Sequence, residues 1–264
     1  MKKSLLAASA VVLAAQAPSH ALFGLGVSYG QNFTTIDGTH ETIGAAQLSP
    51  MLLAYGGSDD ASMILHRGSL SGLTQVGVKT WLDLPLIPVE FEGAANVSFG
   101  AYESSAKMFN GIDTIDVPVS IDIPLDLAGA GDGKTPYTSL ALDVSVRYPF
   151  LTLPPLSPLK PLKFYVGAGA SWFYATRVVS QEDLKELFPT VPTGEVTEAM
   201  LKDELKENIS ESSFGGHVLV GAQFKVPVLP LALFVDGKWY FNAATSDAAS
   251  NNPLAVSGGL AFAL

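Results

Sequence analysis

Three histidines are the residues with the clearest capacity for catalysis. His40, His66 and His217 lie beyond the first 21 residues, and Ser212 and Ser213 closely precede His217. An imidazole beside a serine and a carboxylate can act as the general base of a nucleophilic mechanism. Such a group could serve a hydrolase or a transferase. Nothing in the spacing holds these residues together, so an enzyme is kept as an alternative and no catalytic residue is assigned.

Acidic residues in the segments between apolar stretches could bind Ca²⁺. The candidates are Asp59-Asp60, Asp113 with Asp116, and the glycine-rich segment 129–133. None follows the twelve-residue pattern of a calcium-binding loop, so solvated turns are the better interpretation. The glycine-rich segment also lacks the lysine–serine pair and the helix of a phosphate loop. The sequence therefore predicts no metal site and no cofactor.

Ten other charged residues lie on the polar faces of stretches whose opposite faces are apolar. They are Lys79, Asp83, Glu90, Glu92, Asp143, Arg147, Lys163, Lys225, Asp236 and Lys238. Five are cations and five are anions, so the set is balanced. Charges that leave water are costly unless they are paired. If these faces point inward, we expect the ten side chains to form a network that fills the lumen of the fold.

Residues 76–93 show the repeated unit that would position these charges. Apolar and polar residues alternate on both sides of the segment 84–88, which contains Pro85 and Pro88. A period of two predicts β-strands, and the prolines end a strand because they cannot donate to a ladder. Similar units occur at 144–171 and 220–239. The segments between the units are long and polar.

Short turns on one side and long loops on the other are typical of an antiparallel up-and-down transmembrane β-barrel. Eight strands are predicted, at 22–33, 71–83, 89–102, 137–149, 162–176, 214–226, 231–243 and 254–264. The alternative has ten strands, because 115–127 also alternates and 41–55 would restore an even number. Ten strands would put the proline turns on opposite faces, so we interpret 115–127 as an extension above the membrane.

The first residues and the composition limit the compartment. Residues 1–21 resemble a secretory signal peptide, with Lys2 and Lys3 before an apolar run and a cleavage site after Ala21. Residues 22–264 then form a single barrel domain. The chain has no cysteine, which excludes disulfides and thiolate sites, and its net charge of −10 argues against nucleic acid as a partner. The mean hydropathy of +0.30 favours a lipid-facing barrel over a soluble ligand-binding barrel, the main alternative fold.

Residues 180–213 depart from the strand pattern and predict a helical loop. The segment 182–211 carries nine acidic residues and three lysines, while Val196, Met200, Leu205 and Ile209 recur at helical spacing. The apolar stripe would pack on the barrel mouth as a lid. Alternatively, this acidic loop would bind a partner outside the cell.

Together, the signal peptide, the strand that follows it directly, the proline-rich turns and the long polar loops resemble the small bacterial outer-membrane β-barrel proteins of the OmpA/OmpX type. The resemblance is architectural and carries no functional motif. It implies a place in the outer membrane, contact with its lipids, and insertion by the barrel-assembly machinery through the C-terminal strand. That strand usually ends in an aromatic residue, whereas this one ends in Leu264 with Phe262 two positions earlier.

An eight-stranded barrel is only wide enough for its own side chains to fill it. We therefore expect a structural or interaction protein with a plugged lumen and no enzymatic activity. A small channel or a conduit for hydrophobic ligands is the alternative. Because some barrels of the kind that this chain resembles modify lipids with a histidine near the outer rim, an outer-membrane lipid-modifying enzyme is the further alternative. Nine aromatic residues near strand ends predict a belt at the membrane surfaces: Tyr29, Trp81, Tyr102, Tyr148, Trp172, Tyr174, Phe224, Trp239 and Phe241.

Overall fold

The computed structural model describes residues 23–48, 50–56, 60–84, 87–110, 112–117, 134–153, 161–176, 178, 196–197, 199–200, 210–227 and 229–263. The predicted signal peptide lies outside these ranges, as does most of the predicted helical loop. Of that loop, residues 199 and 200 are helical. The prediction is wrong for 210–213, which begin a strand, because Ser212 and Phe214 continue the alternation of the barrel wall.

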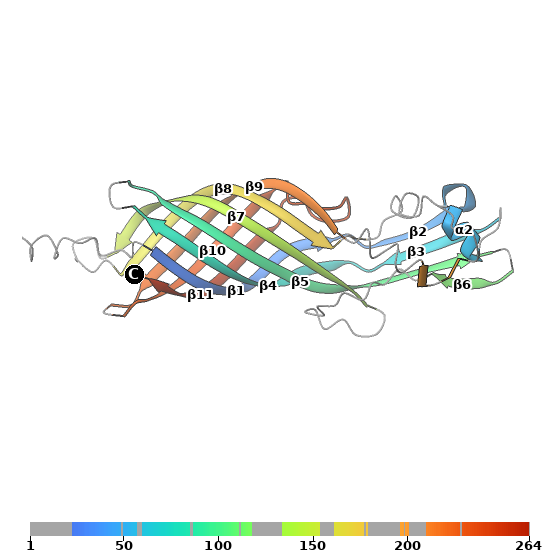
Figure 1. The fold of residues 1–264 in the computed structure, drawn as a ribbon, viewed down its shortest axis with the longest axis horizontal. Coiled ribbons are helices and arrows are strands. Elements are labelled where there is room, and N and C mark those ends of the chain that lie inside the picture. Colours follow the sequence, from blue (N-terminus) through green and yellow to red (C-terminus); the bar gives the residue numbers. More distant parts are fainter. Residues whose placement is uncertain are drawn as a thin grey trace, which may run out of the picture.

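Eight antiparallel strands close into a barrel (Figure 1). They are β1 (Phe23–Ile36), β4 (Leu70–Asp83), β5 (Glu90–Phe109), β7 (Lys134–Leu153), β8 (Leu162–Thr176), β9 (Ser210–Lys225), β10 (Leu231–Phe241) and β11 (Leu254–Ala263). Their order is β5-β4-β1-β11-β10-β9-β8-β7, and β7 pairs with β5 from Glu90↔Arg147 to Glu103↔Lys134. The closed, all-β, eight-stranded prediction is confirmed.

The outer surface of the barrel is apolar, as the period of two predicts. In β1, Leu25, Val27 and Tyr29 are exposed by 55–67%, and the other seven barrel strands also expose large apolar side chains on their outer faces. A continuous apolar exterior around a polar interior suits lipid, where closure satisfies every backbone group. Among the described residues, no helix has the length and apolar character needed to cross a bilayer.

Two of the nine aromatic residues predicted for the membrane belt point into the barrel instead of toward lipid. Trp81 and Tyr102 are buried inside the barrel, whereas the other seven are exposed on its outer face. Trp81 is two residues from Lys79 on β4, so the two side chains share the inward face. The belt prediction is wrong for these two residues, since position near a strand end does not determine the face.

The strand ends that flank the short proline-containing segments lie at one end of the barrel, which we call the turn end. The first described residue and the end of β11 lie there too (Figure 1). The backbone N–H of Ala263 donates to the Pro230 carbonyl at 2.9 Å, and that of Lys225 donates to the Pro161 carbonyl at 2.7 Å. The opposite end, which carries the longer connections, is the loop end.

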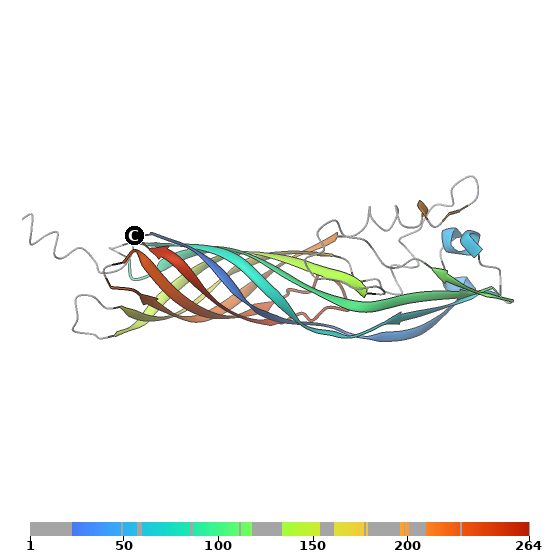
Figure 2. The same ribbon diagram turned by 90° about the horizontal axis from the view of Figure 1, so that it is seen from below.

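A small sheet continues beyond the loop end along the long axis of the barrel (Figures 1 and 2). In this extension sheet, β2 (Thr39–Gly44), β3 (Ser62–Arg67), the distal part of β5 and β6 (Thr114–Val117) are neighbours in that order. The 3₁₀ helix η1 (Ala45–Gln47) and α2 (Pro50–Gly56) follow β2. One face of the sheet is buried, with Ile43, Met63, Leu65, Ala106 and Met108 at 2% exposure or less.

The extension sheet explains why eight strands form the barrel rather than ten. Residues 114–117 pair with β5 outside the barrel, as expected for a segment that rises above the membrane, and 118–127 lie outside the described residues. Residues 39–44 pair with β3 and then lead into η1 and α2. Neither segment enters the barrel wall. Strand β5 accordingly runs to Phe109, beyond the predicted end at residue 102.

Candidate functional site

The most distinctive site is a network of charges inside the barrel. Strands β4, β5, β7, β8 and β10 bring together eight of the ten predicted lumen residues, all at most 6% exposed: Lys79, Glu90, Glu92, Asp143, Arg147, Lys163, Asp236 and Lys238. The set has four cations and four anions. Each residue reaches the interior because it lies on the polar face of an alternating strand.

Arg147 holds the turn-end half of this network. It lies opposite Glu90 in the β5–β7 pair, and its Nη2 is 2.5 Å from Glu90 Oε2. Its other terminal nitrogen, Nη1, donates to Glu92 Oε2 at 2.9 Å. Lys163 donates to the second oxygen of Glu90. One planar guanidinium thus bridges two carboxylates, a geometry that a lysine cannot reproduce.

Glu92 connects the remaining charges. Besides Arg147, it contacts Lys79 Nζ at 3.5 Å and Lys238 Nζ at 3.2 Å. Lys79 also donates to Asp236, and Lys238 donates to Asp143 Oδ2 at 2.8 Å. All eight side chains therefore belong to one connected network. Removing any single charge would leave its partners buried without full compensation.

Aromatic side chains surround the cations of the network. The Lys79 ammonium is 3.8 Å from the ring centroid of Phe234, and the Arg147 guanidinium carbon is 4.5 Å from that of Tyr165. The Tyr165 hydroxyl donates to Asp236. Cations over ring faces gain further stabilisation in a dry interior. These aromatic partners were not predicted from the sequence, although the alternation of β8 and β10 places both rings on the inward face.

Asp83 and Lys225 complete the predicted set but lie apart from the network. Each is the last residue of its strand at the turn end, and each is only partly buried. Within the described part of the chain, neither forms an ion pair within 4 Å. Their position at the strand ends keeps them near water, where pairing is not required.

His217 points into the barrel and forms a hydrogen-bonded chain with two serines. Its Nε2 is 2.7 Å from Ser145 Oγ, and its Nδ1 is 2.7 Å from Ser171 Oγ. Because Ser171 donates its own hydrogen to Asp143 Oδ1 at 2.8 Å, it accepts from Nδ1, and Nε2 is left to accept from Ser145. Ser212 and Ser213, the neighbours considered from the sequence, are not the partners of His217.

The Ser145 hydroxyl thus donates its hydrogen bond to His217, as the hydroxyl of a serine nucleophile donates to its general base. However, Ser145 is 1% exposed and His217 is 2% exposed. The structure gives a substrate no access to this pair. The hydrogen bonds satisfy polar groups that the barrel interior would otherwise leave unpaired.

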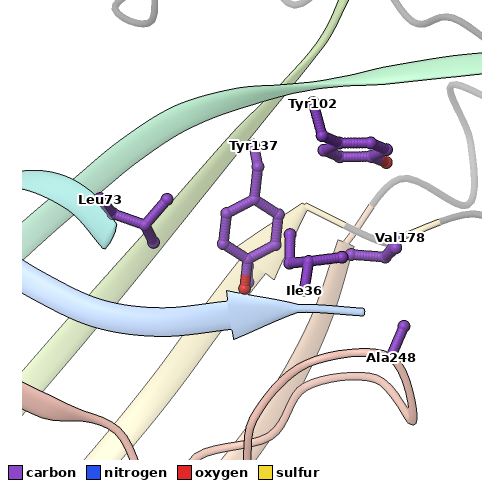
Figure 3. Packing of buried hydrophobic residues seen from close by; sticks show 7 residues of the cluster. Ile36, Leu73, Tyr102, Tyr137, Val178 and Ala248 are labelled. Carbon is purple, nitrogen blue, oxygen red and sulfur yellow. The ribbon is translucent and has the colours of Figure 1, made fainter. Parts of the chain in front are cut away.

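Apolar clusters lie at both ends of the barrel interior: one beside the turn-end charges, on the β4, β10 and β11 side, and one at the loop end. The turn-end cluster contains Trp81, Ala232, Phe234, Ala261 and Ala263. The loop-end cluster contains Ile36, Leu73, Tyr102, Tyr137, Ala175, Val178 and Ala248, whose side chains converge in Figure 3. The β10–β11 connection is held over the loop end by two backbone hydrogen bonds, one of 3.0 Å from the Asp37 N–H to the Ala248 carbonyl and one of 2.9 Å from the Ser250 N–H to the Thr35 carbonyl.

No group of three or more metal-ligating side chains occurs among the described residues. Asp59 and residues 129–133, which were considered from the sequence, lie outside those residues. Asp113 immediately precedes β6, whereas Asp116 lies within β6 and is 3.9 Å from Lys107 in an exposed ion pair. Of the calcium candidates, only Asp60, Asp113 and Asp116 are described, and they belong to no such group.

No family model and no curated protein matches this sequence. Similar solved structures include Neisserial surface protein A, with 12% identity, a TM-score of 0.44, and coverage of 92% of this chain and 96% of that chain. They include Ail, the attachment invasion locus protein of Yersinia pestis, with 9% identity, a TM-score of 0.38, and coverage of 91% and 99%. They also include the outer membrane protease OmpT from Escherichia coli, with 11% identity, a TM-score of 0.34, and coverage of 94% and 98%.

TM-scores below 0.5 and identities of 12% or less carry no conclusion about what this chain binds or does. The closed strand order, the apolar exterior and the buried charges are properties of the chain itself. They make it an integral β-barrel protein of the outer-membrane type.

Proposed function

We propose that this protein is a sealed outer-membrane barrel that anchors the extension sheet outside the cell, where the sheet takes part in interactions. The role is structural rather than conductive or catalytic. The observation that carries the proposal is the filling of the interior. Eight paired charges extend from its middle to the turn end, and apolar clusters lie beside them there and at the loop end.

The extension sheet supports the second half of the proposal. The apolar residues of its buried face belong to none of the barrel clusters, so the sheet has buried apolar surface of its own. Its other face exposes Ile64 and Phe109, and Ile112 beside β6 is 86% exposed. Exposed apolar residues on a rigid sheet are common at sites where proteins meet. An extracellular partner for the acidic loop at 180–213 remains a prediction from the sequence.

The proposed orientation follows from the two ends. Bacterial outer-membrane barrels have short turns in the periplasm and longer loops outside the cell. The turn end would then face the periplasm, after removal of residues 1–21 and assembly through β11 by the barrel-assembly machinery. Outer-membrane lipid would surround the apolar exterior.

Cysteine labelling on intact cells tests this arrangement, since the native chain has no cysteine and gives no background. Ile112→Cys places a thiol beside the extension sheet, and Leu229→Cys places one at the turn end, where the native side chain is 50% exposed. With a membrane-impermeant maleimide, we expect Ile112→Cys to react on intact cells. Leu229→Cys should react only after the outer membrane is permeabilised. The reverse pattern, or labelling of both variants on intact cells, would contradict the proposal.

A further inference from the structure

We propose that His40 and His66 together bind a divalent transition-metal ion on the exposed face of the extension sheet. The two imidazoles lie side by side on neighbouring strands, outside the barrel. The proposed site is separate from the sealed lumen. It adds a binding activity that the anchoring role does not require.

The strand register brings the two histidines together. His40 on β2 is directly opposite His66 on β3, in a pairing that runs without a break from Thr39↔Arg67 to Gly44↔Ser62. Directly opposed side chains of an antiparallel pair point to the same face with their Cβ atoms about 5 Å apart. The opposite face of both strands is the buried one. Both imidazoles therefore project from the exposed face of the β2–β3 pair.

The separation of the rings suits a shared ion. Their centroids are 5.7 Å apart and their planes are inclined by 65°. Two imidazole nitrogens bound at about 2.0–2.1 Å to one tetrahedral ion would place the ring centroids roughly 5–6 Å apart. Rotation of the side chains is thus enough to direct one nitrogen of each ring at a common point, and the strands need not move.

The two rings are also available for binding. Both side chains are exposed, and among the described residues they contact each other but form no hydrogen bond or ion pair. His217 shows the contrast, because both of its nitrogens are already hydrogen-bonded and it is buried. A free nitrogen on each of two adjacent imidazoles is what a chelating pair requires.

The chemistry of the donors selects the kind of ion. Imidazole nitrogen suits Cu²⁺, Zn²⁺ and Ni²⁺ rather than Ca²⁺ or Mg²⁺, and Cu²⁺ binds most tightly in the general order of stability. The described residues contain no group of three metal-ligating side chains, so water would complete the coordination. A bound ion would also link β2 to β3 and stabilise the extension sheet in proportion to its occupancy.

The test uses the full mature chain in detergent micelles, purified through a tag without histidine. Titration with CuCl₂ should show one tight ion per chain, and the electron paramagnetic resonance spectrum should show coupling to two imidazole nitrogens. His40→Gln and His66→Gln should each weaken Cu²⁺ binding at least tenfold and leave coupling to one nitrogen. Lys107→Gln is the matched control, because Lys107 is an exposed residue on the same face of neighbouring β5 and should leave binding unchanged.

Two results would overturn the proposal. One is wild-type affinity in both single histidine variants. The other is a wild-type spectrum with a single coupled nitrogen, which would mean that each histidine binds separately. Zn²⁺ provides a second measurement, independent of spectroscopy. Saturating Zn²⁺ should slow amide exchange in β2 and β3 of the wild-type protein and have no such effect in His40→Gln; equal exchange with and without Zn²⁺ in the wild type would also contradict the shared site.

Discussion

At the scale of single residues, burial determines how strongly a charged side chain affects the stability of the barrel. Lys163 and Lys225 both lie on the polar faces of barrel strands, but only Lys163 is enclosed, and it donates to Glu90. Removing one partner of a buried pair typically costs about 3–5 kcal/mol, since the remaining charge stays in a medium of low dielectric constant. A charge near water has no comparable cost, because water takes the place of its partner.

Lys163→Met and Lys225→Met apply the same chemical change to these two positions. We expect Lys163→Met to lower the free energy of unfolding by about 3 kcal/mol or more. Lys225→Met should change it by no more than about 0.5 kcal/mol. Urea titration of the protein in lipid vesicles, followed by tryptophan fluorescence, measures both. Similar losses in the two variants would mean that the paired network does not carry the stability of the interior.

The limits of prediction at this scale have a physical cause. The period of two assigns a side chain to a face, and it placed Lys79, Glu92 and Arg147 inside. It does not show how far a side chain lies from the end of the barrel, which is why Asp83 and Lys225 were predicted to belong to the network. Nor does it give neighbours across strands. Ser145 and Ser171 reach His217 only through the register of β7, β8 and β9.

At the scale of elements, the long strands combine two environments. β5 and β7 each have 20 residues, about twice the 9–11 that a tilted strand needs to cross a bilayer. The distal part of β5 leaves the barrel and pairs with β3 and β6 in the extension sheet. Strands β2 and β3 were not predicted within the long segment 34–70, because they have only six residues each and give too short an alternation to be recognised.

Leu65→Ala tests whether the extension sheet is a separate unit of stability. Leu65 is fully buried in the extension sheet, so the cavity should cost its local structure about 2–5 kcal/mol and greatly speed amide exchange in β2, β3 and β6. Exchange in the barrel strands should not change. Ile64→Ala is the control, because the adjacent side chain points to the exposed face and is 40% accessible. Loss of protection in the barrel as well would show that the two parts unfold together.

At the scale of the whole molecule, the closed strand order and the side chains that fill the interior together make the barrel suited to a membrane. Eight strands leave no unpaired edge in the lipid region, and an eight-stranded barrel has room for little besides its own side chains. The sequence predicted this number because the three proline turns had to lie on one face, as they do. What it could not predict was the partner of 114–117, because pairing with the distal part of β5 depends on how far that strand rises beyond the barrel.

Single-channel recording in planar lipid bilayers tests most directly whether the barrel is sealed. The inserted protein is first checked on a denaturing gel, where a closed barrel should migrate differently before and after boiling. The ion-pair network and the two apolar clusters predict that the folded wild-type protein gives no stepwise conductance above the bare bilayer. Stable, reproducible conductance steps from the folded wild-type protein would contradict the sealed interior and favour a small channel instead.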